Sequence, residues 1–404
     1  MRNENQNGDG AEGGQEVPAH LLPVIERLKA VPPVRVSHDL APEILARVKA
    51  SERVGTPPSI LWRWVYPLAA AAALVVLLGG LWALSLRRPG PRLAAEEGDR
   101  TPAGRAVDWL CRTQEPDGSW STARWGGSKT FEVALTGLSL MAVLGDRETS
   151  SGSRRVAVDR ASDYLVRLQD EHGEFGAAFD SAPYNQGIAT LALLHVYRER
   201  KSEPLRQAVS RALAAICARQ HHDGGWGYRQ EASPASNLSI TLWQIEALRL
   251  AASLGWPDLR APIERGSRWI AGVADEDGTF GYRQKRDFPE GSPTLTAMGA
   301  MSVLEAAKGI PIPPARRQAI KAQMERLAAA PVETLDYYRR YFLTAALAKL
   351  DEEGARQRLA ALRGELAGRQ VRQGPDAGSW LADDRWSSAG GRIYATSMAS
   401  LSLR

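Results

Sequence analysis

The segment RAVDWLCRTQEPDGSW, from Arg105 to Trp120, recurs along the chain and decides its fold. Three further copies are RASDYLVRLQDEHGEF (160–175), RALAAICARQHHDGGW (211–226) and RGSRWIAGVADEDGTF (265–280). Their final aromatic residues lie 55, 51 and 54 residues apart, and a later copy ends in DAGSW at Trp380. A copy is missing near residue 333, where PVETLDYY stands. A period of this length is typical of repeat architectures, in which each unit is one supersecondary structure.

Each repeat predicts two helices, because apolar residues recur at spacings of three and four. The more amphipathic set covers residues 102–114, 154–170, 204–220, 262–274, 314–329 and 354–371. The more apolar set covers residues 130–145, 184–199, 237–252, 292–309, 336–350 and 391–404. A helix that is apolar all round must be buried, so the second set forms the inner layer. We expect an all-α fold, an α/α toroid of six helical hairpins closed in a ring. An open solenoid is the alternative, but closure leaves no exposed ends.

The repeated motif resembles the QW motif of squalene-hopene and other terpenoid cyclases. The pattern is a basic residue, Gly or Ala, an aromatic residue, an aliphatic residue, Gln, and then Gly-x-Trp. Copies 105–120 and 160–175 match it almost fully, whereas the third has Ala215 for the aromatic residue and the fourth has Ala274 for Gln. In the last copy Gln373 is displaced by one residue. Protein prenyltransferase β subunits share this toroid, and the resemblance spans residues 102–404.

The physical role of the motif is structural. A Gln at a helix C-terminus can bond backbone groups that the helix end leaves unpaired. The aromatic residue buries area against that helix, and Asp-Gly supplies the left-handed residue that ends it. We interpret these residues as structural staples: Gln114, Trp120, Gln169, Phe175, Gln220, Trp226, Phe280 and Trp380.

No complete catalytic motif of the related enzymes is present in the sequence. Squalene-hopene cyclases start cyclisation with a proton from an Asp-x-Asp-Asp motif, and the nearest string here is Leu-Ala-Asp383-Asp384. Asp383 and Asp384 are therefore the candidate acids, although the adjacent Arg385 should lower their pKa.

The resemblance to prenyltransferases implies a zinc ion held by Asp, Cys and His, but the sequence does not support one. Cys111 and Cys217 fall on outer helices, and His221 and His222 fall in a loop. The thioester motif, HExxH, the P-loop and GxSxG are also absent. We therefore predict no metal and no cofactor.

Aromatic residues on the inner helices are expected to line the centre of the ring. They are Phe131, Tyr184, Trp243, Tyr337, Tyr338, Tyr341 and Tyr394. Such rings can bind an apolar ligand or stabilise a carbocation, or they can fill the ring as core. The missing acid, zinc and thioester signatures favour a non-catalytic domain that binds an apolar ligand or a protein partner. The alternative is an isoprenoid cyclase or transferase with unidentified catalytic acids.

The N-terminal part predicts attachment to a membrane. Residues 65–86 carry no charge for 22 residues, and about 20 apolar residues span a bilayer. Trp62, Trp64 and Trp82 stand near the ends of this run, as is typical of interfaces. We expect a single-pass anchor with the toroid on the extracytoplasmic side. Residues 1–60 read as a flexible tail with short helices, and residues 87–101 read as a linker.

The charge distribution excludes nucleic acid as a partner. The 51 basic and 46 acidic residues leave a net charge of +5, and this excess is spread along the chain. A nucleic-acid surface would need a basic stripe.

Overall fold

The computed structural model describes residues 100–146, 151–176, 181–228, 235–289, 292–306, 312–330, 335–350 and 352–404. Over these ranges it contains twelve α-helices and no β-strand beyond three isolated bridges. The outer helices are α5 (Pro102–Thr113), α7 (Ser151–Leu168), α9 (Glu203–Ala218), α11 (Arg260–Gly272), α13 (Pro314–Ala329) and α15 (Glu353–Gly368). The inner helices are α6 (Glu132–Gly145), α8 (Ala182–Arg200), α10 (Leu238–Ser253), α12 (Ser292–Ala306), α14 (Tyr337–Leu350) and α16 (Ser387–Ser402). The predicted all-α class and the alternation of outer and inner helices are confirmed.

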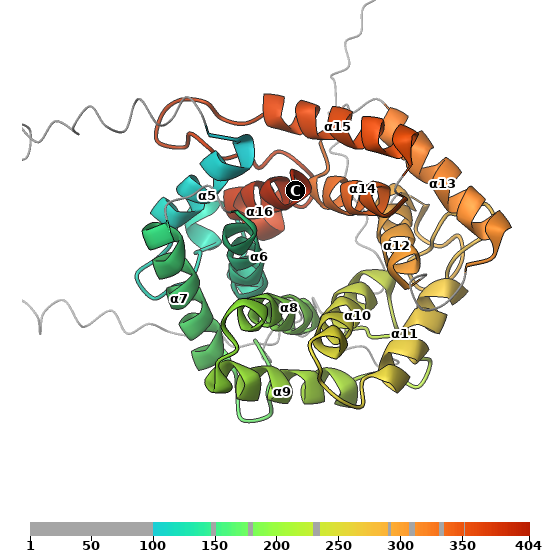
Figure 1. Cartoon of the computed structure of the whole chain (residues 1–404), viewed down its shortest axis with the longest axis horizontal. Coiled ribbons are helices and arrows are strands. Elements are labelled where there is room, and N and C mark those ends of the chain that lie inside the picture. The colour runs from blue at the N-terminus through green and yellow to red at the C-terminus, as the bar shows by residue number, and fades with distance from the viewer. Residues whose placement is uncertain are drawn as a thin grey trace, which may run out of the picture. The chain divides into compact units, whose positions relative to one another are not determined.

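The hairpins form a closed ring, with the inner helices around the centre and the outer helices around them (Figure 1). Each inner helix packs against the inner helices of the neighbouring hairpins. The last inner helix, α16, packs against α6 and α14 and also against the first outer helix, α5. The first and sixth hairpins therefore touch, and the open solenoid is excluded.

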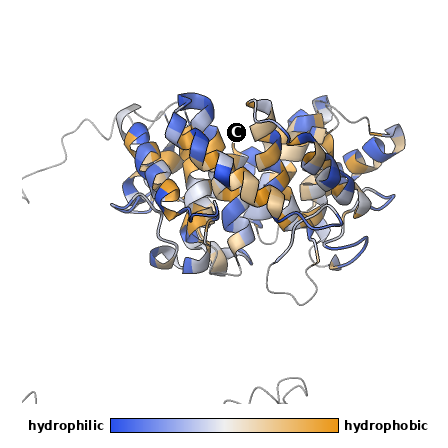
Figure 2. Ribbon diagram, turned by 90° about the horizontal axis from the view of Figure 1, so that it is seen from below, coloured by the Kyte–Doolittle hydropathy of each residue, from blue (hydrophilic) through white to orange (hydrophobic). Residues whose placement is uncertain are grey.

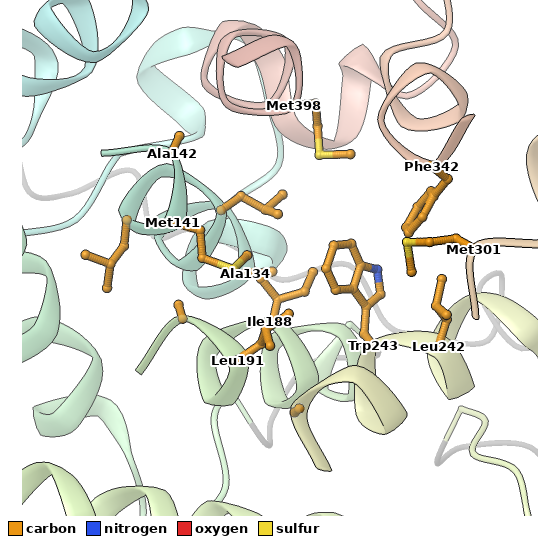
Figure 3. Packing of buried hydrophobic residues seen from close by; sticks show 14 of the residues in the cluster. Ala134, Met141, Ala142, Ile188, Leu191, Leu242, Trp243, Met301, Phe342 and Met398 are labelled. Carbon is orange, nitrogen blue, oxygen red and sulfur yellow. The ribbon is translucent and has the colours of Figure 1, made fainter. Parts of the chain in front are cut away.

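Burial separates the two layers of helices as the hydrophobic pattern predicts. Buried side chains from all six inner helices point toward one another, among them Met141, Ile188, Trp243, Met301, Phe342 and Met398 (Figure 3). The outer helices carry hydrophilic and hydrophobic residues in alternation, as the edge-on view shows (Figure 2). Amphipathic helices can cover an apolar layer while facing water on the other side.

Glutamine side chains at the ends of several outer helices join these helices to the next outer helix. Gln114 Nε2 donates to the carbonyl of Gly118 in its own turn and to that of Ala157 in α7, over 3.0 and 2.9 Å. Gln169 and Gln220 repeat this arrangement with α9 and α11. The glycine of each turn has a positive φ, and a Cβ on Gly118 would lie 2.1 Å from the Arg160 carbonyl oxygen. Only glycine lets the turn approach the next helix this closely.

The ring is closed by a glutamine that the motif alignment missed. Gln370 Nε2 donates to Gly378 O and to Pro102 O of α5, both over 2.8 Å. Its Oε1 accepts from Arg105 Nε over 2.9 Å. The alignment had pointed to Gln373, which is exposed. The turn before Trp380 is longer than in the other copies, so fixed spacing from the aromatic residue selects the wrong glutamine.

The aromatic residues that end the motifs are buried beneath these turns. Trp120, Phe175, Trp226, Phe280 and Trp380 are each at most 3% exposed. The indole N–H groups of Trp120, Trp226 and Trp380 donate to carbonyls of the preceding outer helix over 2.8 Å. Burial with a satisfied indole N–H is the stable arrangement for tryptophan.

Helix α16 begins four residues before the predicted start at residue 391. The hydroxyl of Ser387 donates to Asp384 Oδ1 over 2.8 Å and holds an extra first turn. Gly391 then breaks the helical geometry with φ 59° and ψ −155°. The extra turn carries residues that border the centre of the ring.

The predicted span at residues 65–86, the tail at 1–60 and residues 87–99 of the linker lie outside the described residues. Within the described ranges, no helix combines the length and apolar character needed to cross a bilayer.

Candidate functional site: an aromatic cavity with a carboxylate behind its wall

A cavity of about 370 Å³ lies at the end of the ring where the inner helices begin. Every inner helix contributes to its wall near its N-terminus, and Tyr228, Tyr282, Phe288, Arg385 and Trp386 come from connecting loops. Eight aromatic residues line it: Phe131, Tyr184, Tyr228, Tyr282, Phe288, Tyr338, Trp386 and Tyr394. The other lining side chains are mostly aliphatic. Among the described residues, Arg385 is the one charged side chain in the wall.

The phenols of the wall are held by hydrogen bonds. Tyr184 donates to Ser239 Oγ over 3.0 Å, and Trp243 Nε1 donates to the Tyr338 hydroxyl over 2.6 Å. Burial raises the pKa of Tyr184 and of Tyr338 well above the usual value, so both are neutral. The wall therefore presents aromatic faces and neutral hydroxyls, which favour an apolar ligand and attract positive charge that develops on it.

Four of the seven aromatic residues expected to line the centre border this cavity: Phe131, Tyr184, Tyr338 and Tyr394. The structure places the other three behind or beside the wall. Trp243 is buried beneath Tyr338, and Tyr341 stacks on Trp243 with ring centroids 6.2 Å apart. Tyr337 donates its hydroxyl to the Leu381 carbonyl.

Asp384 lies behind Tyr394, just outside the cavity wall. Its Oδ2 accepts from the Tyr394 hydroxyl and from the Tyr337 N–H, each over 3.0 Å. Its Oδ1 accepts from the Trp386 N–H and from the Ser387 hydroxyl. The neighbouring Asp383 is exposed. The two candidate acids thus occupy different environments, and only Asp384 is hydrogen-bonded to a residue of the cavity wall.

A second carboxylate accompanies Asp384. Asp336 lines a smaller polar pocket of about 180 Å³ together with Asp384, Arg339 and Arg385. This pocket shares Thr294 and Arg385 with the aromatic cavity. Asp336 comes from the stretch PVETLDYY, where a copy of the repeated motif is expected but is missing from the sequence.

The expectation that Arg385 lowers the pKa of Asp384 is wrong. Arg385 Nε lies 3.5 Å from Asp336 Oδ2, and its guanidinium stacks on Trp386. Burial raises the pKa of Asp384, and the charge of Asp336 adds to that rise. Hydrogen bonds from Ser387, the Tyr337 N–H and Tyr394 oppose the rise without cancelling it. A like charge nearby disfavours ionisation, which is the condition a proton donor needs.

No three His, Cys, Asp or Glu side chains of the described ranges group closely enough to hold a metal ion. Burial raises the pKa of the Cys111 thiol to about 12, which keeps it protonated. A thiol is a poor metal ligand compared with a thiolate.

Several residues of the site carried no signal in the sequence. Tyr228, Tyr282, Phe288 and Trp386 reach the cavity from loops, and helical periodicity says nothing about loop residues. Asp336 precedes α14 directly, and carboxylates at helix N-termini are usually caps. Asp336 does cap α14, because its Oδ1 accepts a hydrogen bond from the backbone N–H of Arg339.

Comparison with known proteins gives one relative in sequence. No family model matches the chain. Drimenyl diphosphate synthase from Streptomyces showdoensis is 32% identical over 217 residues. The match covers 52% of this chain and 37% of that enzyme, so the chain spans well under half of the relative's length.

Solved structures with the same architecture come from more than one class of protein. Cellobiose 2-epimerase from Spirochaeta thermophila superposes with a TM-score of 0.55 at 15% identity, over 78% of this chain and 98% of its own. Type II terpene cyclase MstE from Scytonema superposes with a TM-score of 0.52 at 15% identity, over 75% and 96%. At such identities the likeness shows the fold alone. The relative in sequence is an enzyme, and this likeness agrees better with the alternative left open by the sequence, an isoprenoid cyclase or transferase, than with a non-catalytic domain.

Proposed function

We propose that the toroid takes an isoprenoid chain into its aromatic cavity and cyclises it after protonating one carbon–carbon double bond. The observation that carries this proposal is the hydrogen bond between Tyr394, in the wall of an apolar cavity, and Asp384, a carboxyl group whose pKa is raised by burial.

The cavity suits an isoprenoid in both size and chemistry. Its volume of about 370 Å³ falls in the usual range for small-molecule pockets, about 300–1,000 Å³. An isoprenoid is branched, apolar and rich in double bonds, so it gains from burial against aliphatic and aromatic walls. A sugar would require several polar partners, and the described wall supplies few of them.

The proton would travel from Asp384 through Tyr394. When Asp384 is protonated, its O–H can donate to the phenol oxygen, and the phenol hydrogen is then free to point into the cavity. Transfer of that hydrogen to an alkene carbon leaves a carbocation, while Tyr394 regains a proton from Asp384 and stays neutral. The carboxylate formed on Asp384 takes up a proton again from water in the polar pocket beside Asp336.

The aromatic wall would then guide the carbocation. The faces of Phe131, Tyr184 and Tyr338 present negative charge density to a cation within about 6 Å of the ring centre. Loss of a proton from the cyclised cation to water ends the reaction. The double bond electrons form the new carbon–carbon bonds, so no oxidant or reductant is consumed.

One observation favours the alternative, an isoprenoid-binding domain without chemistry. Asp384 reaches the cavity only through Tyr394, and no carboxylate of the described chain lines the cavity itself. A binding domain would need the aromatic wall but would not need the link between Tyr394 and Asp384.

The test is to incubate detergent-purified full chain with squalene and with diphosphates of shorter polyprenols, and to analyse extracts by gas chromatography and mass spectrometry. Isothermal titration measures binding in parallel. A cyclised product that disappears in Tyr394→Phe supports the proposal. Binding without product would establish the alternative, and absence of binding would exclude both.

A further inference from the structure

A second pocket lies at the opposite end of the inner helices from the aromatic cavity. It has a volume of about 180 Å³, and its wall comes from α10, α11, α12 and the start of α13, which follow one another around the ring (Figure 1). Thr294, near the start of α12, lines the aromatic cavity, whereas Ala306, at the end of the same helix, lines this pocket. At about 1.5 Å per residue, these two positions are about 18 Å apart along the helix. The pocket is therefore separate from the cavity assigned to the isoprenoid.

Three arginines line this second pocket, and no carboxylate of the described residues lines it with them. They are Arg249, Arg268 and Arg316. Arg249, whose side chain is 14% exposed, is fixed by its partners. Its Nη1 donates to Glu246 Oε1 over 2.9 Å, and its Nη2 donates to Ser267 Oγ over 3.1 Å. Glu246 thus balances one of the three positive charges.

The other two charges have no such partner. Within the described part of the chain, neither Arg268 nor Arg316 forms an ion pair. Glu264, one helical turn before Arg268, is bound to Arg260 over 2.7 Å. Cations gathered around a concave site attract counter-ions into it. Two unbalanced guanidinium groups match the charge of a phosphate group, about −1.5 to −2 at neutral pH, better than the single charge of a carboxylate.

The start of α13 adds to the positive potential. Ile312 and Pro313 line the pocket directly before this helix. No side chain caps its N-terminus, and its first turn contains no acidic residue. Because a helix N-terminus carries partial positive charge, Arg316 is unfavourable in this turn unless an anion lies beside it. The N–H groups of an open helix N-terminus also bind phosphate oxygens directly.

The remaining wall of the pocket is mostly apolar. Ile270, Val303 and Ile312 contribute the larger apolar side chains. The volume of about 180 Å³ is several times the share of one water molecule, about 30 Å³, so a phosphate group and a few carbon atoms fit. Carbon atoms attached to the phosphate would gain from burial against this wall.

We propose that this pocket binds a phosphate group carried by a small molecule. Arg268 and Arg316 would hold the phosphate oxygens, and carbon atoms of a phosphate ester would lie against Ile270, Val303 and Ile312. The site is filled independently of the aromatic cavity, so the inference does not rest on the function proposed for that cavity. Free phosphate carries the same charge, and the test separates the two sources.

The test is isothermal titration of detergent-purified full chain, at low salt concentration, with inorganic phosphate and with butyl phosphate. We expect saturable binding of both, because screening of the arginines is then weak. Tighter binding of butyl phosphate would support an ester as the ligand, and equal affinities would support free phosphate. Absence of binding by both probes would overturn the proposal.

A pair of variants tests the two arginines. Arg268→Gln with Arg316→Gln should weaken binding at least about tenfold for each arginine, the usual effect of losing a hydrogen bond to a charged group. Arg155→Gln with Arg160→Gln makes the same change of charge at exposed positions of α7 and should leave the affinity unchanged. Equal weakening in both pairs would reduce the effect to the overall charge and would contradict the site.

Hydrogen exchange followed by mass spectrometry locates the ligand in the unmodified chain. Exchange of residues 312–320, at the start of α13, should slow when butyl phosphate is added. Binding with unchanged exchange in this segment would place the ligand elsewhere and overturn the proposal.

Discussion

The hydroxyl of Tyr394 donates to Asp384 Oδ2 over 3.0 Å and joins two compartments of opposite character. Tyr394 belongs to the wall of the apolar cavity, and Asp384 belongs to the polar pocket beside it. A carboxylate placed inside the apolar cavity would repel the π electrons of a ligand and would cost desolvation energy. The phenol lets a proton cross the wall without placing that charge inside.

Removal of either member of this pair should abolish cyclisation. We expect Tyr394→Phe and Asp384→Asn each to lower product formation by about 10²–10⁴-fold, the usual contribution of a positioned acid. The matched control is Asp383→Asn, an exposed neighbour that undergoes the same chemical change. The measurement is product yield by mass spectrometry, and equal activity of the Asp383 and Asp384 variants would contradict the proton route.

The pH dependence of the reaction should follow the raised pKa of Asp384. The donor is the neutral carboxyl, so the rate should be full below its pKa and should fall as the pH rises through it. Asp336→Asn removes the like charge that adds to the rise. The pKa of Asp384 should then decrease, and the fall in rate should occur at a lower pH. A profile that is unchanged, or that moves to higher pH, would show that Asp336 does not act on the donor.

Gln370 should matter for stability where Gln373 does not. Gln370→Ala leaves the carbonyls of Pro102 and Gly378 and the Arg105 guanidinium without this partner. Loss of partners for buried polar groups costs about 1–3 kcal/mol, so the free energy of unfolding should decrease by about that amount. Gln373→Ala, an exposed change of the same kind, should have no effect. Urea unfolding followed by circular dichroism measures both variants.

The motif tryptophans should contribute to stability through burial. Trp120→Ala and Trp226→Ala each remove a large buried ring and an indole hydrogen bond. The expected loss is about 3–5 kcal/mol each. Trp386→Ala, at a site with 36% exposure, should cost about 1 kcal/mol or less. Similar melting temperatures for all three variants would mean that the motif tryptophans do not hold the turns.

His195 on inner helix α8 should make the toroid less stable in acid. Burial, with a smaller effect from Arg198, lowers its pKa from 6.5 to about 4. Between these two pKa values the unfolded chain binds a proton at His195 and the folded chain does not. The free energy of unfolding therefore decreases as the pH falls from about 6.5 to about 4. The full difference corresponds to about 3 kcal/mol.

The check is urea unfolding at neutral and acidic pH. His195→Gln should remove this part of the pH dependence, whereas His222→Gln, at an exposed position, should retain it. Retention of the full acid effect in His195→Gln would assign it to other groups.

Local sequence patterns determined the all-α class, the twelve helices and the inner and outer layers. Helical periodicity, Gly turns and the Gln-to-aromatic spacing act over a few residues, so a single repeat already contains their physical cause. The residues at the centre of the ring were only partly predictable. Phe131, Tyr184, Tyr338 and Tyr394 face the cavity as expected, but Trp243 and Tyr341 lie behind it. Which side of an apolar helix faces the centre depends on how its neighbours rotate it.

Only the tertiary structure decided ring closure through Gln370 and the pairing of Asp336 with Asp384. Gln370 meets Pro102 across 268 residues of sequence, and Asp384 meets the Tyr337 backbone across 47. Such contacts depend on the sum of all hairpin rotations around the ring and have no local pattern. The sequence places Arg385 beside Asp383 and Asp384, yet the fold turns Arg385 toward Asp336 and partly buries Asp384. The pKa of a carboxyl group depends on its burial and on the charges around it in space, and adjacency in the chain determines neither.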